Sequence, residues 1–266
     1  MSMAEPPDQS TVSVRDDPSL ALLCSLALNR RLHGLPLWTA LATPLAMAVL
    51  LVIAVFNGAE GGRGEVWDHW FGLSLYLWAI LTPMATGLYA LGSFQADEDA
   101  KRVLYCYAFP RRRLLFAEVL ALTILWTGAA LLFAALVALI CLANGTPDLI
   151  VRAFAGALLP VLAALPTMVL CVLAAEVWGV AGPICIGVAG MLFGALVGDK
   201  TYWWVFPPAW PTRVVIPFAE TRAVSDFHPT DPLLSLSVLP VITIATLLLT
   251  GVLLIVSAWY VDKRDL

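Results

Sequence analysis

Long runs without a charged side chain dominate this chain, and short polar segments separate them. Each run has about 20 residues or more, which at about 1.5 Å per residue is enough to cross about 30 Å of hydrocarbon. The pattern predicts an all-α integral membrane protein. We expect six membrane-spanning helices, at about residues 37–57, 70–93, 116–143, 152–175, 178–198 and 235–260.

The boundary between the fourth and fifth spans is the least obvious of these. The apolar stretch from Ala153 to Gly198 is interrupted only by Glu176. At about 1.5 Å per residue this stretch is far too long for one crossing, so it must fold back. Glu176, Gly179, Gly182 and Pro183 supply polar and helix-breaking residues, and we place the turn there.

The N-terminal region divides into a polar tail and a short helix. Residues 1–17 are acidic and contain almost nothing to bury, so we expect a disordered cytoplasmic tail followed by a single transmembrane domain over residues 18–266. Ser19 can cap a helix in which apolar residues recur at spacings of three and four. Because Gly34 and Pro36 break this helix before the first span, we interpret it as an amphipathic elbow helix in the membrane surface. The alternative is an extension of the first span.

Composition agrees with the pattern. Of the 266 residues, 61% are hydrophobic and 13% are charged, against about 25% charged in ordinary soluble domains. The formal net charge is −4, and no basic cluster with interleaved aromatic residues is present, so nucleic acid is not an expected partner.

The basic residues predict the orientation of the chain. Six spans place both termini on one side, together with the connection between the second and third spans. Ten of the 15 Lys and Arg residues fall on that side: Arg15, Arg30, Arg31, Lys101, Arg102, Arg111, Arg112, Arg113, Lys263 and Arg264. Five fall on the other: Arg63, Arg152, Lys200, Arg213 and Arg222. Since cytoplasmic loops carry the excess of positive charge, both termini are predicted to be cytoplasmic.

The cytoplasmic connection from Ser93 to Glu118 is the longest charged segment between apolar runs. Acidic residues at its start are followed by basic residues. This order interacts favourably with the dipole of a short amphipathic helix, and a proline then ends that helix. A rigid element fused to two spans can transmit motion from a soluble partner, although a solvated positive-inside loop is the simpler alternative. The candidate coupling residues are Asp97, Glu98, Asp99, Lys101, Arg102, Phe109, Pro110 and Arg111.

The connection from Asp199 to Asp231, on the outer side, combines aromatic residues with prolines. It is too aromatic for a plain solvent loop and too rich in proline for another crossing, so we expect short re-entrant helices at the outer interface. It is either an interfacial anchor or an external lid that meets an amphipathic substrate. The residues proposed for the lid are Trp203, Trp204, Phe206 and Trp210.

Glycines line one stripe of the fifth span. Small residues on one side of a membrane helix allow another helix to approach closely. The stripe is either a seam between subunits, or a sliding contact, or ordinary packing within the chain. Its residues are Gly187, Gly190, Gly194 and Gly198.

Residues for catalysis are hard to find. His33, His69 and His228 are far apart and outside the predicted spans, and the five cysteines show no CxxC spacing. The spans also lack the paired ionisable residues that an intramembrane enzyme needs. We therefore expect no enzymatic activity and no catalytic residue, cofactor site or metal site in this chain.

The cytoplasmic connection resembles that of the membrane subunits of type-2 ABC exporters. In that family an acidic residue, a short coupling helix, and then Pro and Arg precede the third span, and Glu98 and the run Phe109 to Arg113 follow the same order. The family usually has a lysine where this chain has Glu118. Within that group the chain is most similar to the lantibiotic-immunity permeases, through Leu28 to Arg31, Trp78 to Pro83, Tyr202 to Pro207 and Trp210 to Arg213.

This resemblance implies a transport subunit in a bacterial plasma membrane. Two copies of an ATP-binding subunit, which hold ATP and Mg, would act on a pair of permeases made of this chain and either a second copy or a sister chain. The complex would expel a lantibiotic-like or other amphipathic antimicrobial peptide for self-protection. The alternatives are a type-2 ABC permease for another drug, antibiotic or lipid, and a non-ABC membrane enzyme or scaffold.

Overall fold

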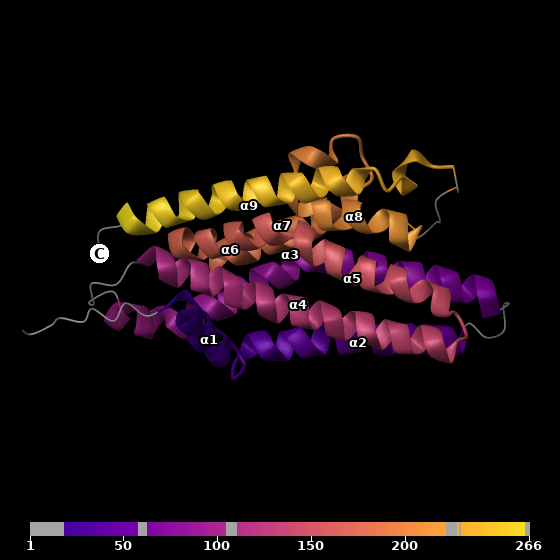
Figure 1. The fold of residues 1–266 in the computed structure, drawn as a ribbon, viewed down its shortest axis with the longest axis horizontal. Coiled ribbons are helices and arrows are strands. Elements are labelled where there is room, and N and C mark those ends of the chain that lie inside the picture. Colours follow the sequence, from indigo (N-terminus) through magenta and orange to yellow (C-terminus); the bar gives the residue numbers. More distant parts are fainter. Residues whose placement is uncertain (1–18, 58–62, 105–110, 222–227, 229, 264–266) are drawn as a thin grey trace, which may run out of the picture.

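The structure is a computed structural model that describes residues 19–57, 63–104, 111–221, 228 and 230–263, and these are almost entirely helical (Figure 1). The longer helices are α1 (Leu20–Arg31), α2 (Leu35–Asn57), α3 (Arg63–Leu104), α4 (Arg111–Ala143), α5 (Ile150–Ala163), α6 (Leu165–Trp178), α7 (Ala181–Val197), α8 (Trp210–Ala219) and α9 (Val238–Lys263). The short 3-10 helices are η2 (Pro147–Leu149), η3 (Trp203–Val205), η4 (Pro207–Ala209) and η5 (Pro232–Leu234).

Within the described residues, five helical segments are long and apolar enough to cross a membrane. They are Pro36–Phe56, Trp67–Gly92, Arg112–Ala143, Pro147–Trp178 and Val238–Lys263. The fifth predicted span corresponds to α7, which has only 17 residues and a length of about 26 Å. The membrane character expected from the sequence is confirmed, while α7 is shorter than the other spans.

The long helices run side by side along one axis (Figure 1). In this view α1, the start of α4 and the C-terminal end of α9 lie at the left, whereas the turn between α4 and α5 lies at the right. We call these the α1 end and the α4–α5 end.

Helix α3 differs from its prediction at both ends. A span over about 70–93 and a separate coupling helix were expected, but α3 is one helix of 42 residues. The expectation failed because the charged residues after Gly92 end the apolar run but contain no helix breaker. Charged side chains end the part of a helix that can lie in the membrane, but they do not interrupt the backbone hydrogen bonds, so the helix itself continues.

The fourth span is interrupted at Ala164, which separates α5 from α6. Pro166, in the first turn of α6, has no backbone N–H with which to continue the hydrogen-bond ladder of α5. The turn predicted after Glu176 is confirmed, since Gly179 ends α6 with a φ of 62°, a conformation that favours glycine. The interruption at Ala164 was not predicted.

Helix α1 begins as its sequence indicates. The Ser19 hydroxyl accepts a hydrogen bond from the Leu22 backbone N–H at 3.2 Å, which caps the first turn. Cys24 and Ala27 are buried against Ala117 and Ala121 of α4. Leu22 and Leu26 on the other side are exposed, so α1 packs on α4 through small residues and presents leucine side chains on its exposed side. Residues 1–17, the predicted tail, lie outside the described residues.

Aromatic rings fill the middle of the bundle. Trp78 of α3 stacks on Trp126 and Phe133 of α4, with ring centroids 5.0 and 4.5 Å apart. The Trp78 indole Nε1 donates a hydrogen bond to the Ala157 carbonyl of α5 at 3.0 Å. These contacts join α3, α4 and α5 into one core.

The connection between α7 and α9 forms the short helices predicted for it, but α8 is not exposed at a surface. Every residue of α8 except Phe218 is buried, and the helix packs against α3 and α5. The prolines that prevent another crossing, Pro207, Pro208 and Pro211, lie in or next to the first turns of η4 and α8, where a missing N–H costs nothing.

Candidate functional site

The predicted coupling residues lie at the α1 end of the molecule. Asp97, Glu98, Asp99, Lys101 and Arg102 belong to the last 12 residues of α3, after Gly92, and Arg111 begins α4. The structure describes the helical backbone of these residues but not their side chains. Phe109 and Pro110 lie outside the described residues.

An ion pair at the same end joins α1 to α4. Arg31 Nη2 lies 2.6 Å from Glu118 Oε1, and the two side chains are only 1% and 15% exposed. Glu118 lies near the start of the predicted third span, and its side chain is mostly buried in this contact. Its carboxylate is directed to α1, and α1 and α4 are held together at this point by charge as well as by the small residues described above.

The glycine stripe of α7 is covered by other parts of the chain. A Cβ added to Gly187 would meet the Pro83 carbonyl oxygen of α3 at 3.2 Å, and one added to Gly190 would meet the Pro83 side chain at 2.7 Å. Further along, a Cβ on Gly194 would lie 2.9 Å from the Pro208 carbonyl oxygen, and one on Gly198 would lie 2.9 Å from Thr212 Cγ2. The stripe thus packs α7 on α3, η4 and α8.

The four aromatic residues predicted for the outer lid have different surroundings. Trp210 is buried in a cluster with Ala163 and Val214, and Trp203 packs against the same cluster. The Trp204 side chain is 63% exposed, and its backbone carbonyl accepts a hydrogen bond from Trp210 Nε1 at 3.3 Å. Phe206 meets Phe193 of α7 edge-on, with centroids 6.3 Å apart. Only part of the predicted lid is therefore accessible.

The C-terminal end of α8 is held by an arginine of α5. Arg152 donates to the Phe218 carbonyl oxygen through Nη2 at 2.7 Å and Nε at 3.2 Å. Its Nη2 also lies 3.0 Å from Glu220 Oε1. A cation beside the last carbonyls of a helix donates hydrogen bonds to acceptors that have no partner within the helix. It also interacts favourably with the negative end of the helix dipole. Gly72 of α3 packs closely against this end of α8, next to the Ala219 carbonyl.

A second arginine lies inside the same region. Arg213 of α8 is buried, and its Nη1 donates to the Leu233 carbonyl of η5 at 3.1 Å. Burial lowers the pKa of this guanidinium, while the charges of Asp231 and Asp199 raise it. Arg213 therefore ties α8 to the segment that leads into α9.

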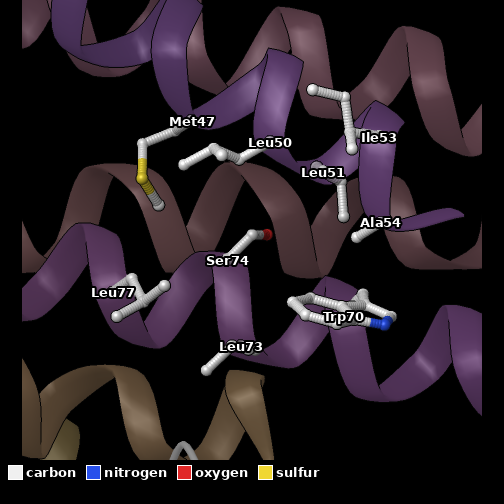
Figure 2. A pocket seen from close by; sticks show the side chains of 9 residues that line it. All are labelled: Met47, Leu50, Leu51, Ile53, Ala54, Trp70, Leu73, Ser74 and Leu77. Atoms are coloured by element: carbon white, nitrogen blue, oxygen red, sulfur yellow. The ribbon is translucent and has the colours of Figure 1, made fainter. Parts of the chain in front are cut away.

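Two cavities along the helices are lined almost entirely by apolar side chains. The larger, about 470 Å³, lies between α2 and α3, and Figure 2 shows Met47 and Leu50 facing Leu77 and Ser74 across it. Its one hydroxyl, that of Ser74, already donates to the Phe71 carbonyl at 2.7 Å. The smaller, about 310 Å³, lies between α6, α7, η4 and α9 and includes Phe206 and Thr167.

The residues that the structure describes contain no group of three or more His, Cys, Asp or Glu side chains placed to hold a metal ion. Comparison of the chain with protein-family models, with curated proteins and with solved structures finds no match.

Sequence reasoning found the positions of the helices but not the charge pairs between them. Arg31 and Glu118 are 87 residues apart, and Arg152 and Phe218 are 66 apart. No local spacing connects such residues. The only available signal was the occurrence of a lone charged residue near the end of an apolar run, which ordinary snorkelling explains equally well.

Proposed function

We propose that this chain is the membrane subunit of an ATP-driven exporter. The observation that carries the proposal is the length of α3. Its 42 residues extend about 63 Å, about twice the thickness of the hydrocarbon layer. The part after Gly92, about 18 Å long, continues the span without a break, so force applied to it reaches the membrane helices directly.

The charge order of this extension supports the same function. Asp97, Glu98 and Asp99 precede Lys101 and Arg102 on it, which is the arrangement that resembles the coupling segment of type-2 ABC exporters. We propose that this segment docks on an ATP-binding subunit present in two copies, with ATP and Mg bound there. Closure of that pair would shift the permeases between two arrangements.

The proposed setting is a bacterial plasma membrane with the α1 end in the cytoplasm. Helix α1, the start of α4 and the end of α9 share that end (Figure 1), as do most of the basic residues. In this arrangement α1 is the elbow helix, α7 is the fifth crossing, and α8 is a re-entrant helix. A second permease, identical or a sister chain, completes the transporter.

The proposed substrate is an amphipathic antimicrobial peptide that is expelled for self-protection. The feature that supports an amphipathic substrate is the exposed Trp204 near the partly exposed Phe206, in a connection that we predict to lie on the outer side. Affinity purification of the tagged full-length chain from its native membranes, with identification of the bound subunits by mass spectrometry, tests the assembly. Recovery without any ATPase would contradict the proposal.

The coupling role of Glu98 predicts a loss of ATPase stimulation. Glu98→Ala should lower the stimulated ATPase rate of the purified complex about 10-fold, since a charge-assisted hydrogen bond contributes about 1.5–3 kcal/mol. Asp68→Ala is the matched control, because it removes an exposed acid from the opposite end of the same helix and should leave the rate unchanged. Equal rates in both variants would remove Glu98 from the coupling contact.

The aromatic connection predicts two different phenotypes. Trp204→Ala should change the unfolding free energy by about 0.5 kcal/mol or less but reduce peptide resistance, because this side chain is largely exposed. Trp210→Ala should cost about 3–5 kcal/mol, since Trp210 is only 5% exposed. Thermal unfolding in detergent and a growth assay with added peptide separate the two. Full resistance in Trp204→Ala would show that Trp204 is an interfacial anchor and not part of a lid that meets the substrate.

A further inference from the structure

Helix α3 contains a position at which a helix usually bends. Pro83 lies in its interior and has no backbone N–H, so the Ala79 carbonyl lacks its usual partner within the helix. The Thr82 hydroxyl donates to the Trp78 carbonyl at 2.9 Å, an arrangement that also tends to bend helices. Sharp kinks in long helices occur mostly at such positions. Helix α3 is nevertheless continuous from Arg63 to Leu104.

Helix α7 packs against α3 at this position. A Cβ added to Gly190 would lie 2.7 Å from Pro83 Cβ, and one added to Gly187 would lie 3.2 Å from the Pro83 carbonyl oxygen. Both distances are shorter than an ordinary van der Waals contact, so the absence of a side chain at these positions lets α7 approach this closely. The ring and the carbonyl group of Pro83 therefore both pack against α7.

A proline of α7 forms the same kind of contact in the opposite direction. Pro183 lies in the first turn of α7, and a Cβ added to Gly87 of α3 would lie 2.6 Å from the Pro183 carbonyl oxygen. In each helix the proline precedes the glycine by four residues, which is about one turn. Two close contacts that are about one turn apart fix the angle between α3 and α7 as well as their separation.

Helix α7 is itself held near both of its ends. Close to its start, a Cβ added to Gly182 would lie 2.5 Å from the Ala174 carbonyl oxygen of α6. Close to its end, Gly194 packs on the Pro208 carbonyl of η4, as described above. Because backbone atoms lie against α7 at both places, α7 resists displacement by a bend in α3.

We propose that α7 braces α3 at Pro83, so that its contacts hold α3 at one fixed angle and the proline does not act as a hinge. Force on the part of α3 after Gly92 then displaces α3 and α7 together and is not lost in a bend beside the proline. In this proposal the glycine stripe is neither a seam between subunits nor a sliding contact. The use of the brace in transport rests on the proposed function, whereas the brace itself depends only on the contacts between the two helices.

Distances between pairs of spin labels test the proposal, with a cysteine-free full-length chain in nanodiscs. One label replaces Lys101, in the last turn of α3. The reference label replaces either Leu26 of α1 or Ile255 of α9, which are both exposed, and these two helices lie on opposite sides of the bundle (Figure 1). The part of α3 from Pro83 to Lys101 is about 27 Å long, so a bend of about 20° would move its end by about 9 Å. For the original sequence we expect one narrow distance distribution for each pair.

Added methyl groups on α7 should release the bend. The double variant Gly187→Ala with Gly190→Ala places two of them on the side of α7 that contacts Pro83. We expect at least one of the two distributions to broaden by about 9 Å, the displacement that a bend of about 20° produces. The matched control is Gly128→Ala with Gly251→Ala, since nothing within 4 Å would contact a Cβ at either position, and its distributions should stay narrow.

Pro83→Ala, added to the α7 double variant, distinguishes a released hinge from general damage to the fold. Alanine restores the missing N–H, so the distributions should become narrow again. Unchanged distributions in the double variant would overturn the proposal, because α3 would then keep its angle without α7. Broadening that Pro83→Ala does not reverse would overturn it as well. Gly190→Ala alone provides the same comparison if the double variant does not fold. The measurement uses neither ATP nor a partner subunit, so its failure is distinguishable from failure of the proposed coupling.

Discussion

Gly72→Ala is expected to destabilise the protein by about 3 kcal/mol or more, the upper range for overpacking of a close contact. A Cβ at this position would overlap the Ala219 carbonyl oxygen at the end of α8 and would lie 3.2 Å from Thr221 Cγ2. A carbonyl is backbone and does not move aside as a flexible side chain would. The loss should appear as a lower midpoint of thermal unfolding in detergent.

Gly128→Ala provides the matched control for this substitution. Gly128 lies in the middle of α4, and nothing within 4 Å would contact its Cβ. Alanine is more favourable than glycine in a helix by about 0.5–1 kcal/mol, so this variant should be as stable as the original or slightly more stable. If Gly72→Ala unfolded at the same temperature as Gly128→Ala, the close contact between α3 and α8 would be refuted.

The position of Gly72 also links stability to the connection between α7 and α9, which contains α8. Arg152 of α5 holds the same end of α8 through the Phe218 carbonyl. Residues of α3, α5 and α8 thus meet at one place, and displacement of α8 by an added methyl group would loosen the Arg152 contacts as well. We therefore expect the damage from Gly72→Ala to include the exposure of α8, which limited proteolysis would detect.

Glu118→Ala is expected to cost about 3–5 kcal/mol, the usual cost of removing one partner of a buried ion pair. Arg31 is the group left behind, and it is 1% exposed. Since the pair lies between α1 and α4, α1 should detach before the rest of the bundle unfolds. Faster tryptic cleavage within α1, together with a lower unfolding midpoint, measures this effect.

Two further variants separate the ion pair from a general effect of charge. The double variant Arg31→Met with Glu118→Met removes both charges and should recover most of the stability, as replacement of a buried pair by apolar residues often does. Arg112→Ala removes an exposed charge near the start of the same helix and should have little effect. A Glu118→Ala protein as stable as Arg112→Ala would show that the pair does not hold α1.

Much of the helical framework could be derived from local sequence. The lengths of the apolar runs predict the spans because the thickness of the hydrocarbon layer sets the length that a membrane-spanning helix needs. Ser19 and Gly34 mark the ends of α1 through capping and helix-breaking chemistry that acts within one turn. The turn at Gly179 follows for the same reason, and the prolines between residues 207 and 217 exclude a further long helix there.

Local sequence was less reliable where the end of a helix does not coincide with a change in hydropathy. The charged residues after Gly92 suggested a new element, yet α3 continues to Leu104, because hydrogen bonding along a helix does not depend on side-chain polarity. Conversely, the apolar residues around Ala164 concealed the break between α5 and α6. Pro166 was present in the sequence, but proline also occurs within continuous helices of this chain, as Pro83 of α3 shows.

By itself the sequence determined that the chain is a helical membrane protein, approximately where its spans lie, and where its charges and glycines occur along them. Only the tertiary structure decided which faces meet. Helix α9 exposes Leu248 and Ile255 and buries Ile242 and Val261, so the same kinds of residue face the surroundings and the protein. Because lipid is as apolar as a bundle interior, hydrophobicity does not distinguish the two faces. The pairing of Arg31 with Glu118, the contact of Gly72 with α8 and the contact of Gly187 with Pro83 follow from packing between helices that are distant in the chain.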